Sequence, residues 1–381
     1  MSVANPNTQK PVAILIPCLL TGGTEVATYE TALAFKAQAM PVDVIVYFDE
    51  IDPVMLQTFQ SANINIIALG AVRGQGIYRQ WILMWRLFSV LLRGRYRIIW
   101  LQYMTPTLLP LLIARLLTRH LVAAVHVAAH HFQPPAIKRL RWLTRHWLTR
   151  LVCVSQTTAD GIFKGTGMQA QVTVIPNTLN LAHAQAANTR DWRVELGWPK
   201  QSLVLGFVGR LATIKGADVL LEAVALAYQQ LPQLKLVLVG DGDERCNLEL
   251  QAKQLGIADL VHFAGRLTRD AIYSATKGFD VAVIPSREEG FGLSALEAMA
   301  AGVPVLTSRV DALTEVIIDG KTGLLFEVGN ATALAEAIVN LGVNGELRMQ
   351  MGQAGVQQVA AHYDISIYRQ RMVAFVSELT N

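Results

Sequence analysis

Cysteine, signal-like segments and long apolar runs are scarce in this 381-residue sequence. Its three cysteines, Cys18, Cys153 and Cys246, lie far apart without Cys-x-x-Cys spacing, which argues against a disulfide framework and a structural zinc site. Residues 1–10 are polar and lack the apolar core of a secretory signal, and the apolar stretch 105–114 is far too short to span a membrane. A cytoplasmic protein is therefore expected.

Acidic residues are missing from a long internal stretch. No Asp or Glu occurs in 53–159, which holds 13 Lys and Arg and five of the seven Trp. Residues 1–185 carry 16 basic and 7 acidic side chains, a balance of +9, whereas 186–381 carry 17 and 22, a balance of −5. The first half of the chain should therefore seek an anionic partner.

Apolar residues make up 52% of the chain, and its length exceeds the size at which one core usually stops growing, so two domains are expected. Apolar runs alternate with helical stretches in both halves, which predicts two Rossmann-like, doubly wound parallel sheets facing a central cleft. The expected strands are 11–17, 42–47, 64–69, 97–101, 121–127, 150–154 and 172–175, then 202–208, 234–239, 260–264, 279–284, 303–307 and 323–326.

The domain limits follow from where this pattern is interrupted. Residues 178–200 have no clean periodicity and are expected to connect the domains. We expect a first domain over 1–183, with 363–381 packing back on it, and a second over 184–362. Helices are predicted at 330–343, 345–361 and 366–379.

Polar groups follow the strands of the second half, at the end where such folds bind ligands. Arg210 and Lys215 come after the first of these strands, and both are able to face one diphosphate. Glu289 precedes a glycine turn after a later strand, and Glu297 lies in the helix that follows. Because free N–H groups at a helix start favour a diphosphate, and carboxylates accept hydrogen bonds from hydroxyls, a phosphorylated sugar carrier fits this loop.

Together these motifs resemble the retaining glycosyltransferases of family 4, which have the GT-B fold. The Glu-x7-Glu element from Glu289 to Glu297 is the most specific of them. The others are Gly22-Gly23, Val154-Ser155, Ile175-Pro-Asn177, Gly209-Arg-Leu211, Lys215-Gly216, Gly240-Asp-Gly242, Phe263-Ala-Gly265, Gly302-Val-Pro-Val305 and Gly320-Lys-Thr-Gly-Leu324. The sequence departs from the usual pattern of this family at Thr178-Leu-Asn180, after Asn177, and in lacking a Pro before Glu315. These departures bear on details of the transferred sugar and not on the class of enzyme.

The resemblance implies a role for each site residue. Glu289 would accept hydrogen bonds from the transferred sugar and Glu297 from the ribose, while Arg210 and Lys215 would neutralise the diphosphate. The helix start would contribute backbone N–H groups, and a further loop would line the base. These groups are Phe291, Gly292 and Leu293 at the helix start and Gly265, Arg266 and Leu267 in the base loop.

The first half would supply the acceptor side. Gly22 and Gly23 open a helix after the first strand, where either an ordinary turn or a close approach to phosphates or acceptor fits. The resemblance places His126, at a strand end, near the sugar and the leaving phosphate. It also implies retention of configuration without a metal or cofactor. The donor implied by the resemblance is a nucleotide-diphosphate sugar, with UDP favoured over GDP or ADP.

Two patterns suggest metal sites, and both are better explained otherwise. His130 and His131 are adjacent but lack a nearby carboxylate. Asp241-Gly-Asp243 looks like the metal-binding motif of another glycosyltransferase class, but it follows a strand and precedes a helix, so Asp243 is predicted to cap that helix. No metal site is therefore predicted.

Residues 77–93 and 136–150 combine Arg, Trp and Leu in helical stretches. The simpler interpretation is that one face of each helix packs on the sheet. The missing acids and clustered Trp also suit an anionic lipid surface, so peripheral membrane association through 77–150, on the inner face of the cell membrane, is predicted. The acceptor is expected to be lipid-linked, a glycan or a small molecule. No nucleic-acid recognition motif accompanies the charge. Two alternative functions stay open: another GT-B activity such as epimerisation, or a catalytically silent partner.

Overall fold

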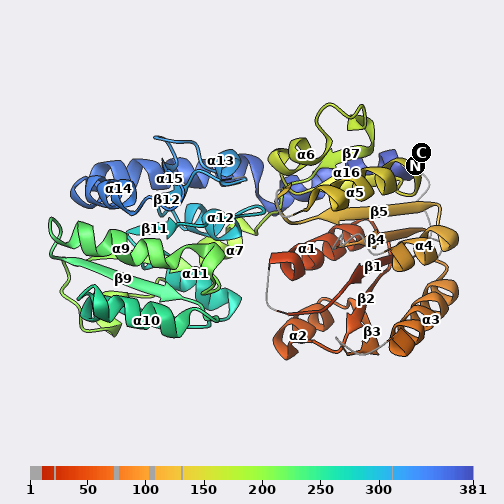
Figure 1. Cartoon of the computed structure of the whole chain (residues 1–381), viewed down its shortest axis with the longest axis horizontal. Coiled ribbons are helices and arrows are strands. Elements are labelled where there is room, and N and C mark those ends of the chain that lie inside the picture. The colour runs from red at the N-terminus through yellow and green to blue at the C-terminus, as the bar shows by residue number, and fades with distance from the viewer. Residues whose placement is uncertain are drawn as a thin grey trace. The chain divides into compact units, whose positions relative to one another are not determined.

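The computed structural model describes residues 11–20, 23–72, 77–102, 108–129, 132–310 and 312–380. The chain divides into two compact units, unit 1 over Met1–Asn177 with Ser366–Asn381 and unit 2 over Thr178–Ile365 (Figure 1). The domain limits expected from the sequence stay predictions, because compactness alone does not show that a unit folds independently.

Unit 1 is built on a seven-stranded parallel sheet with the order β3-β2-β1-β4-β5-β6-β7. Its strands are β1 Val12–Ile16, β2 Val42–Phe48, β3 Asn65–Ala71, β4 Ile98–Leu101, β5 His120–Val125, β6 Arg150–Cys153 and β7 Val172–Val174. All the residues of β1 and β4 are buried, which explains their unbroken apolar runs: helices cover both faces of the sheet.

The helices of unit 1 lie on either side of this sheet (Figure 1). Helices α3, α4, α5 and α6 contribute to one buried core. On the other side, the fully buried Trp100 packs edge-on against Phe35 of α1 and Phe375 of α16, each with ring centroids 5.7 Å apart. The helices are α1 Gly23–Ala37, α2 Pro53–Ser61, α3 Ile77–Gly94, α4 Leu108–Leu117, α5 Pro134–His146, α6 Gln156–Phe163, the short η3 Gln169–Gln171 and α16 Ile365–Thr380.

Unit 2 has a six-stranded parallel sheet with the order β10-β9-β8-β11-β12-β13. Its strands are β8 Leu203–Val208, β9 Leu234–Val239, β10 Val261–Gly265, β11 Val281–Ile284, β12 Val305–Ser308 and β13 Gly323–Phe326. Its helices are α7 Leu181–Ala186, α8 Trp192–Glu195, η4 Thr213–Lys215, α9 Ala217–Tyr228, α10 Arg245–Gln254, η5 Ala258–Leu260, α11 Arg269–Lys277, α12 Leu293–Ala300, α13 Leu313–Val316, α14 Ala331–Val343 and α15 Gly345–His362.

Every strand predicted from the sequence is confirmed to within two residues at either end. The two parallel, doubly wound sheets confirm the fold class. Within the described residues, no two of the three cysteines are joined by a disulfide.

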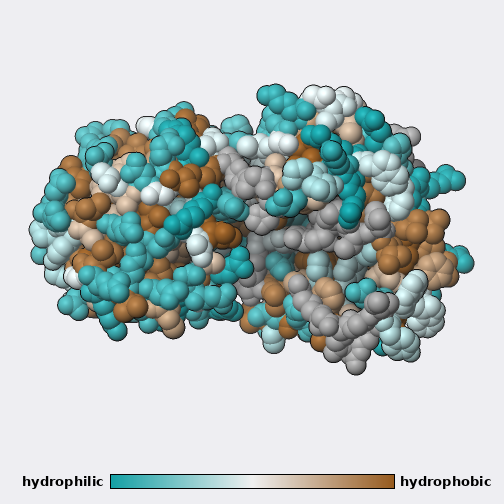
Figure 2. All heavy atoms as spheres, viewed as in Figure 1, coloured by the Kyte–Doolittle hydropathy of each residue, from teal (hydrophilic) through white to brown (hydrophobic). Residues whose placement is uncertain are grey.

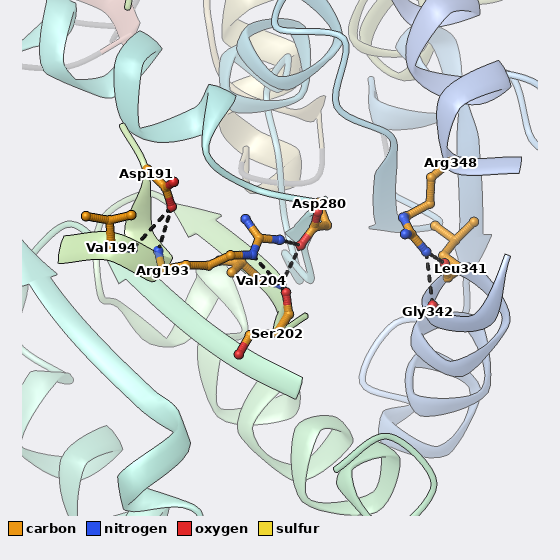
Figure 3. Close-up of polar contacts among 9 residues, drawn as sticks. All are labelled: Asp191, Arg193, Val194, Ser202, Val204, Asp280, Leu341, Gly342 and Arg348. Carbon is orange, nitrogen blue, oxygen red and sulfur yellow. Dashed lines mark hydrogen bonds and ion pairs between the residues drawn. The ribbon is translucent and has the colours of Figure 1, made fainter. Parts of the chain in front are cut away.

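Residues 178–200 are not the irregular connection that the sequence predicted. They belong to unit 2, where Trp192 is completely buried and donates a hydrogen bond to the Ala275 carbonyl at 2.9 Å. Figure 3 shows the neighbouring Arg193, which bonds the Ser202 carbonyl and the Asp280 carboxylate. The prediction failed because this segment is stabilised by distant residues and not by a local periodic pattern.

Candidate functional site

The order of strands in unit 2 determines where its polar loops meet. From β8 the chain continues to β9 and β10 on one side, and from β11 to β12 and β13 on the other. Because β8 and β11 are neighbours in the sheet, the loops after their carboxyl ends leave from the switch point, where open α/β sheets bind ligands. The loop after β8 carries Arg210 and Lys215, and the loop after β11 carries Glu289.

Glycines bring the backbones of these loops into direct contact. Gly216 has φ 68°, and a Cβ added there would lie 2.0 Å from the Pro285 carbonyl oxygen. Gly240, after β9, has φ 136°, and its added Cβ would lie 1.8 Å from the Gly209 carbonyl oxygen. Only glycine combines these φ values with so close an approach.

The two loops also meet through side chains. The Lys215 Nζ donates to Glu289 Oε2 at 2.5 Å, and Ser286 Oγ lies 3.4 Å from the same oxygen. The Lys215 and Glu289 side chains are 23% and 13% exposed. A cation and an acceptor of hydrogen bonds are therefore held side by side within reach of a ligand.

Arg287 clamps the turn that carries Lys215, and the sequence reasoning missed it. Its Nη1 and Nη2 bond Asp218 Oδ1 and Oδ2 at 2.8 and 2.6 Å, and its backbone N–H bonds the Ile214 carbonyl at 2.8 Å. Burial would raise the pKa of Asp218, but the hydrogen bonds and charge of Arg287 lower it below its ordinary value. This bidentate pair holds the loop of Glu289 against the turn of Lys215.

The helix α12 begins at this loop. Its N-cap, Gly292, has φ 92° and, as a glycine, offers no side chain to cap the first N–H groups of the helix, which begin with Leu293. Phe291, just before, is buried. Glu297 lies on the second turn of α12, where burial raises its pKa to about 7, an effect that the charge of Arg269 partly offsets. The helix start has the uncapped donors that an anion requires.

The remaining predicted donor-site residues of unit 2 lie at neighbouring strand ends. Arg210 is exposed and lies two residues after the end of β8. Gly265 ends β10 with φ 70°, and its carbonyl accepts a hydrogen bond from the Gly240 N–H at 2.8 Å. Arg266 and Leu267 follow in the same loop, exposed and half-buried respectively. Their proposed contacts to the base stay predictions.

The prediction that Asp243 caps α10 is wrong. The N-cap is Glu244, and no side chain donates or accepts a capping hydrogen bond there. The Glu244 N–H bonds the Leu211 carbonyl at 3.0 Å, which sets the start of the helix by a tertiary contact. Asp241 instead stabilises its own turn by accepting from the Gly242 N–H at 2.9 Å.

In unit 1, His126 follows β5 and has both ring nitrogens buried without a hydrogen-bond partner in the described part of the chain. Burial lowers its pKa to about 4, so the ring is neutral at physiological pH. Gly23 is the first residue of α1 and is exposed. Three residues considered from the sequence, Gly22, His130 and His131, lie outside the described residues.

Tyr363, a second residue that the sequence reasoning missed, touches the donor loop of unit 2. Its ring packs edge-on against Phe291, with centroids 5.9 Å apart, and its hydroxyl donates to the Glu315 carbonyl at 3.3 Å. Its own carbonyl accepts from the Thr178 hydroxyl at 2.7 Å. No motif marks this tyrosine, since its partners are distant in sequence.

In the described ranges, no group of three or more His, Cys, Asp or Glu is arranged to hold a metal ion. Nor does any helix in these ranges combine the length and apolar character needed to cross a membrane.

Two family models match the chain. The model described as Glycosyltransferase Family 4 matches residues 21–183, and the one described as Glycosyl transferases group 1 matches residues 188–358. The second match contains every strand-end loop of unit 2 described above.

Curated relatives resemble part of the chain. D-inositol 3-phosphate glycosyltransferase of Corynebacterium jeikeium is 38% identical over 172 residues, which cover 43% of this chain and 41% of the relative. The enzyme of the same name from Streptomyces avermitilis is 32% identical over 219 residues, covering 55% and 47%. The chain thus matches less than half the length of each of these relatives.

Solved structures share the fold over nearly the whole chain. HepE of Anabaena in complex with UDP-glucose has a TM-score of 0.82 at 20% identity, covering 97% of this chain and 99% of that one. Sucrose-phosphate synthase of Thermosynechococcus elongatus has a TM-score of 0.82 at 21% identity, covering 98% and 99%. Since the two family models together account for most of the sequence, this protein belongs to family 4 of the glycosyltransferases and has the GT-B fold.

Proposed function

We propose that the protein transfers a sugar, with retention of configuration, from a UDP-sugar to an acceptor. The observation that carries this proposal is the contact between Lys215 and Glu289 at the switch point of unit 2, next to the uncapped start of α12. The similarity to D-inositol 3-phosphate glycosyltransferases and to HepE, which was solved with UDP-glucose, supports it. GDP- and ADP-sugars are the alternative donors.

The chemistry follows from charge development at the leaving group. As the glycosidic bond breaks, negative charge grows on the diphosphate, so Lys215, Arg210 and the α12 N–H groups stabilise the transition state more than the ground state. Glu289 accepts hydrogen bonds from the sugar and Glu297 from the ribose. The neutral His126 lies near the sugar in this proposal.

For the acceptor we propose a lipid-linked glycan presented at an anionic membrane surface on the cytoplasmic side. The basic, Trp-rich range 77–150 supports a membrane-associated acceptor over a free small molecule. Epimerisation of a nucleotide sugar and a silent binding role are the competing functions. Epimerisation predicts a new nucleotide sugar, and the silent role predicts no product.

The test measures release of nucleotide and the fate of the sugar. Purified protein is incubated with UDP-, GDP- or ADP-sugars, with and without membrane extract, and products are identified by mass spectrometry. We expect release of UDP that is stimulated by extract and coupled to a glycosylated lipid. A new nucleotide sugar without release would instead establish an epimerase, and no turnover of any donor would establish the silent role.

Donor binding should depend on pH through Glu297, whose pKa of about 7 in the free protein lies above its ordinary value because of burial. The ribose hydroxyls bind the ionised carboxylate, so this carboxyl must lose its proton, and affinity rises with pH through that pKa. Between pH 6 and pH 8 we expect UDP-glucose to bind about tenfold more tightly, measured by calorimetry.

Glu297→Gln is the control for this dependence. The amide is neutral at every pH, so its variant should bind more weakly and with a flat profile. UDP-glucose is suitable because its diphosphate does not titrate over this range. Equal pH slopes for the two proteins would show that Glu297 does not contact the ribose.

A further inference from the structure

The outer face of α3 carries a stripe of large apolar side chains. Trp81 and Trp85 are 64% and 68% exposed, and Tyr78, Phe88 and Leu92 are exposed along the same stripe. Their spacing of three and four residues places them on one side of the helix. Packing on the sheet does not explain them, because Leu83, Leu87 and Leu91 already form the inner face. The simpler interpretation therefore fails for these tryptophans.

Helix α4 extends this surface. It packs against α3. Leu109, Leu112 and Leu116 repeat the same spacing, and Leu116 is 72% exposed. Their inner neighbours, Leu111 and Ala114, are buried. Figure 2 shows the apolar colour gathered over α4, beside the paler Trp-bearing surface of α3. We call the exposed residues of these two stripes the α3–α4 face.

The charged side chains at the ends of these two helices are basic. Arg93 and Arg95 lie at the end of α3, and Arg115 and Arg119 lie at the end of α4, all four exposed. Within the described residues none of the four forms an ion pair with a carboxylate. No acidic residue is close to them in sequence, since 53–159 contains no Asp or Glu.

From this arrangement we propose that the α3–α4 face docks on an anionic lipid bilayer, with Trp81, Trp85 and Leu116 entering the interface. This proposal rests on the proposed function and extends it, because it names the surface that contacts the membrane holding the lipid-linked acceptor. Tryptophan and tyrosine prefer the membrane interface, and unpaired arginines bind anionic headgroups. An apolar face of this extent is otherwise a liability in water.

A second copy of the chain is a poorer occupant of the face. In a symmetric dimer the arginines of one copy would lie close to those of the other, and like charges repel. A bilayer instead offers negative charge and apolar depth together. Both helices would then lie in the plane of the interface, as amphipathic helices without a spanning segment do.

The test is flotation of the full-length protein with vesicles of phosphatidylcholine, with and without phosphatidylglycerol. We expect wild type to float with anionic vesicles only, with a blue shift of tryptophan fluorescence. Trp85→Ser combined with Leu116→Ser should lower the partition coefficient about tenfold or more. The matched control is Leu250→Ser, which changes a 55% exposed leucine of α10 in unit 2 and should float like wild type.

Further measurements separate this proposal from others. A urea unfolding midpoint equal to that of wild type shows that the double variant is folded. Flotation of the double variant equal to wild type would overturn the proposal. A second result would also overturn it: wild type does not float with vesicles but sediments as a dimer, and the two substitutions abolish that dimer. Flotation needs no turnover, so absence of transferase activity would refute the proposed function and leave this inference standing.

Discussion

Lys215→Ala should lower kcat about 10²- to 10³-fold while the protein stays folded. Lys215 reaches the switch point of unit 2 and contacts Glu289 at 2.5 Å. In the proposed reaction its ammonium faces the diphosphate, where charge develops as the sugar departs. Loss of one such preorganised group typically costs about 10²- to 10³-fold in rate. The measurement is UDP release at saturating UDP-sugar.

Lys253→Ala is the matched control, since this exposed lysine of α10 loses the same side chain away from the candidate site. It should retain wild-type kcat. A kcat of Lys215→Ala within twofold of wild type would contradict the role given to the lysine. A rise in KM alone would assign it to uniform binding of the donor instead.

Gly216→Ala should destabilise the protein by about 3 kcal/mol or more, because it combines positive φ with a backbone clash. The added Cβ would lie 2.0 Å from the Pro285 carbonyl oxygen, which is backbone and unable to swing aside. The loops after β8 and β11 must then separate, which also breaks the contact between Lys215 and Glu289. Urea unfolding measures the stability, and UDP release measures the activity.

Gly256→Ala separates the two causes. Gly256 has φ 69°, almost that of Gly216, but its added Cβ would meet nothing within 4 Å. Its free energy of unfolding should therefore fall only by the cost of the left-handed conformation, about 1–2 kcal/mol. If both variants were equally unstable, the close approach to Pro285 would have no energetic weight.

Local patterns were enough to predict most of the fold. Most strands are runs of apolar residues between turn signals, and burial on both faces makes the runs of the central strands continuous. The loop with Glu289 was found for a similar reason, since glycines, carboxylate and helix start all lie within a few residues. Predictions failed where distant partners decide the structure. Trp192 is buried by unit 2 and Glu244 begins α10 through Leu211, and neither partner is visible in a local window.

By itself, the sequence determined the two parallel sheets, the family and the residues at the strand ends of unit 2. The spacing of apolar residues and the residue types that follow each strand can both be recognised within a short stretch of sequence. Only the tertiary structure decided that Arg287 clamps Asp218, that Lys215 contacts Glu289, and which tryptophans are exposed. The physical reason is that an amphipathic pattern is the same whether a side chain faces the core or the solvent. Packing of α3 on the sheet and on α4 determines which face stays outside.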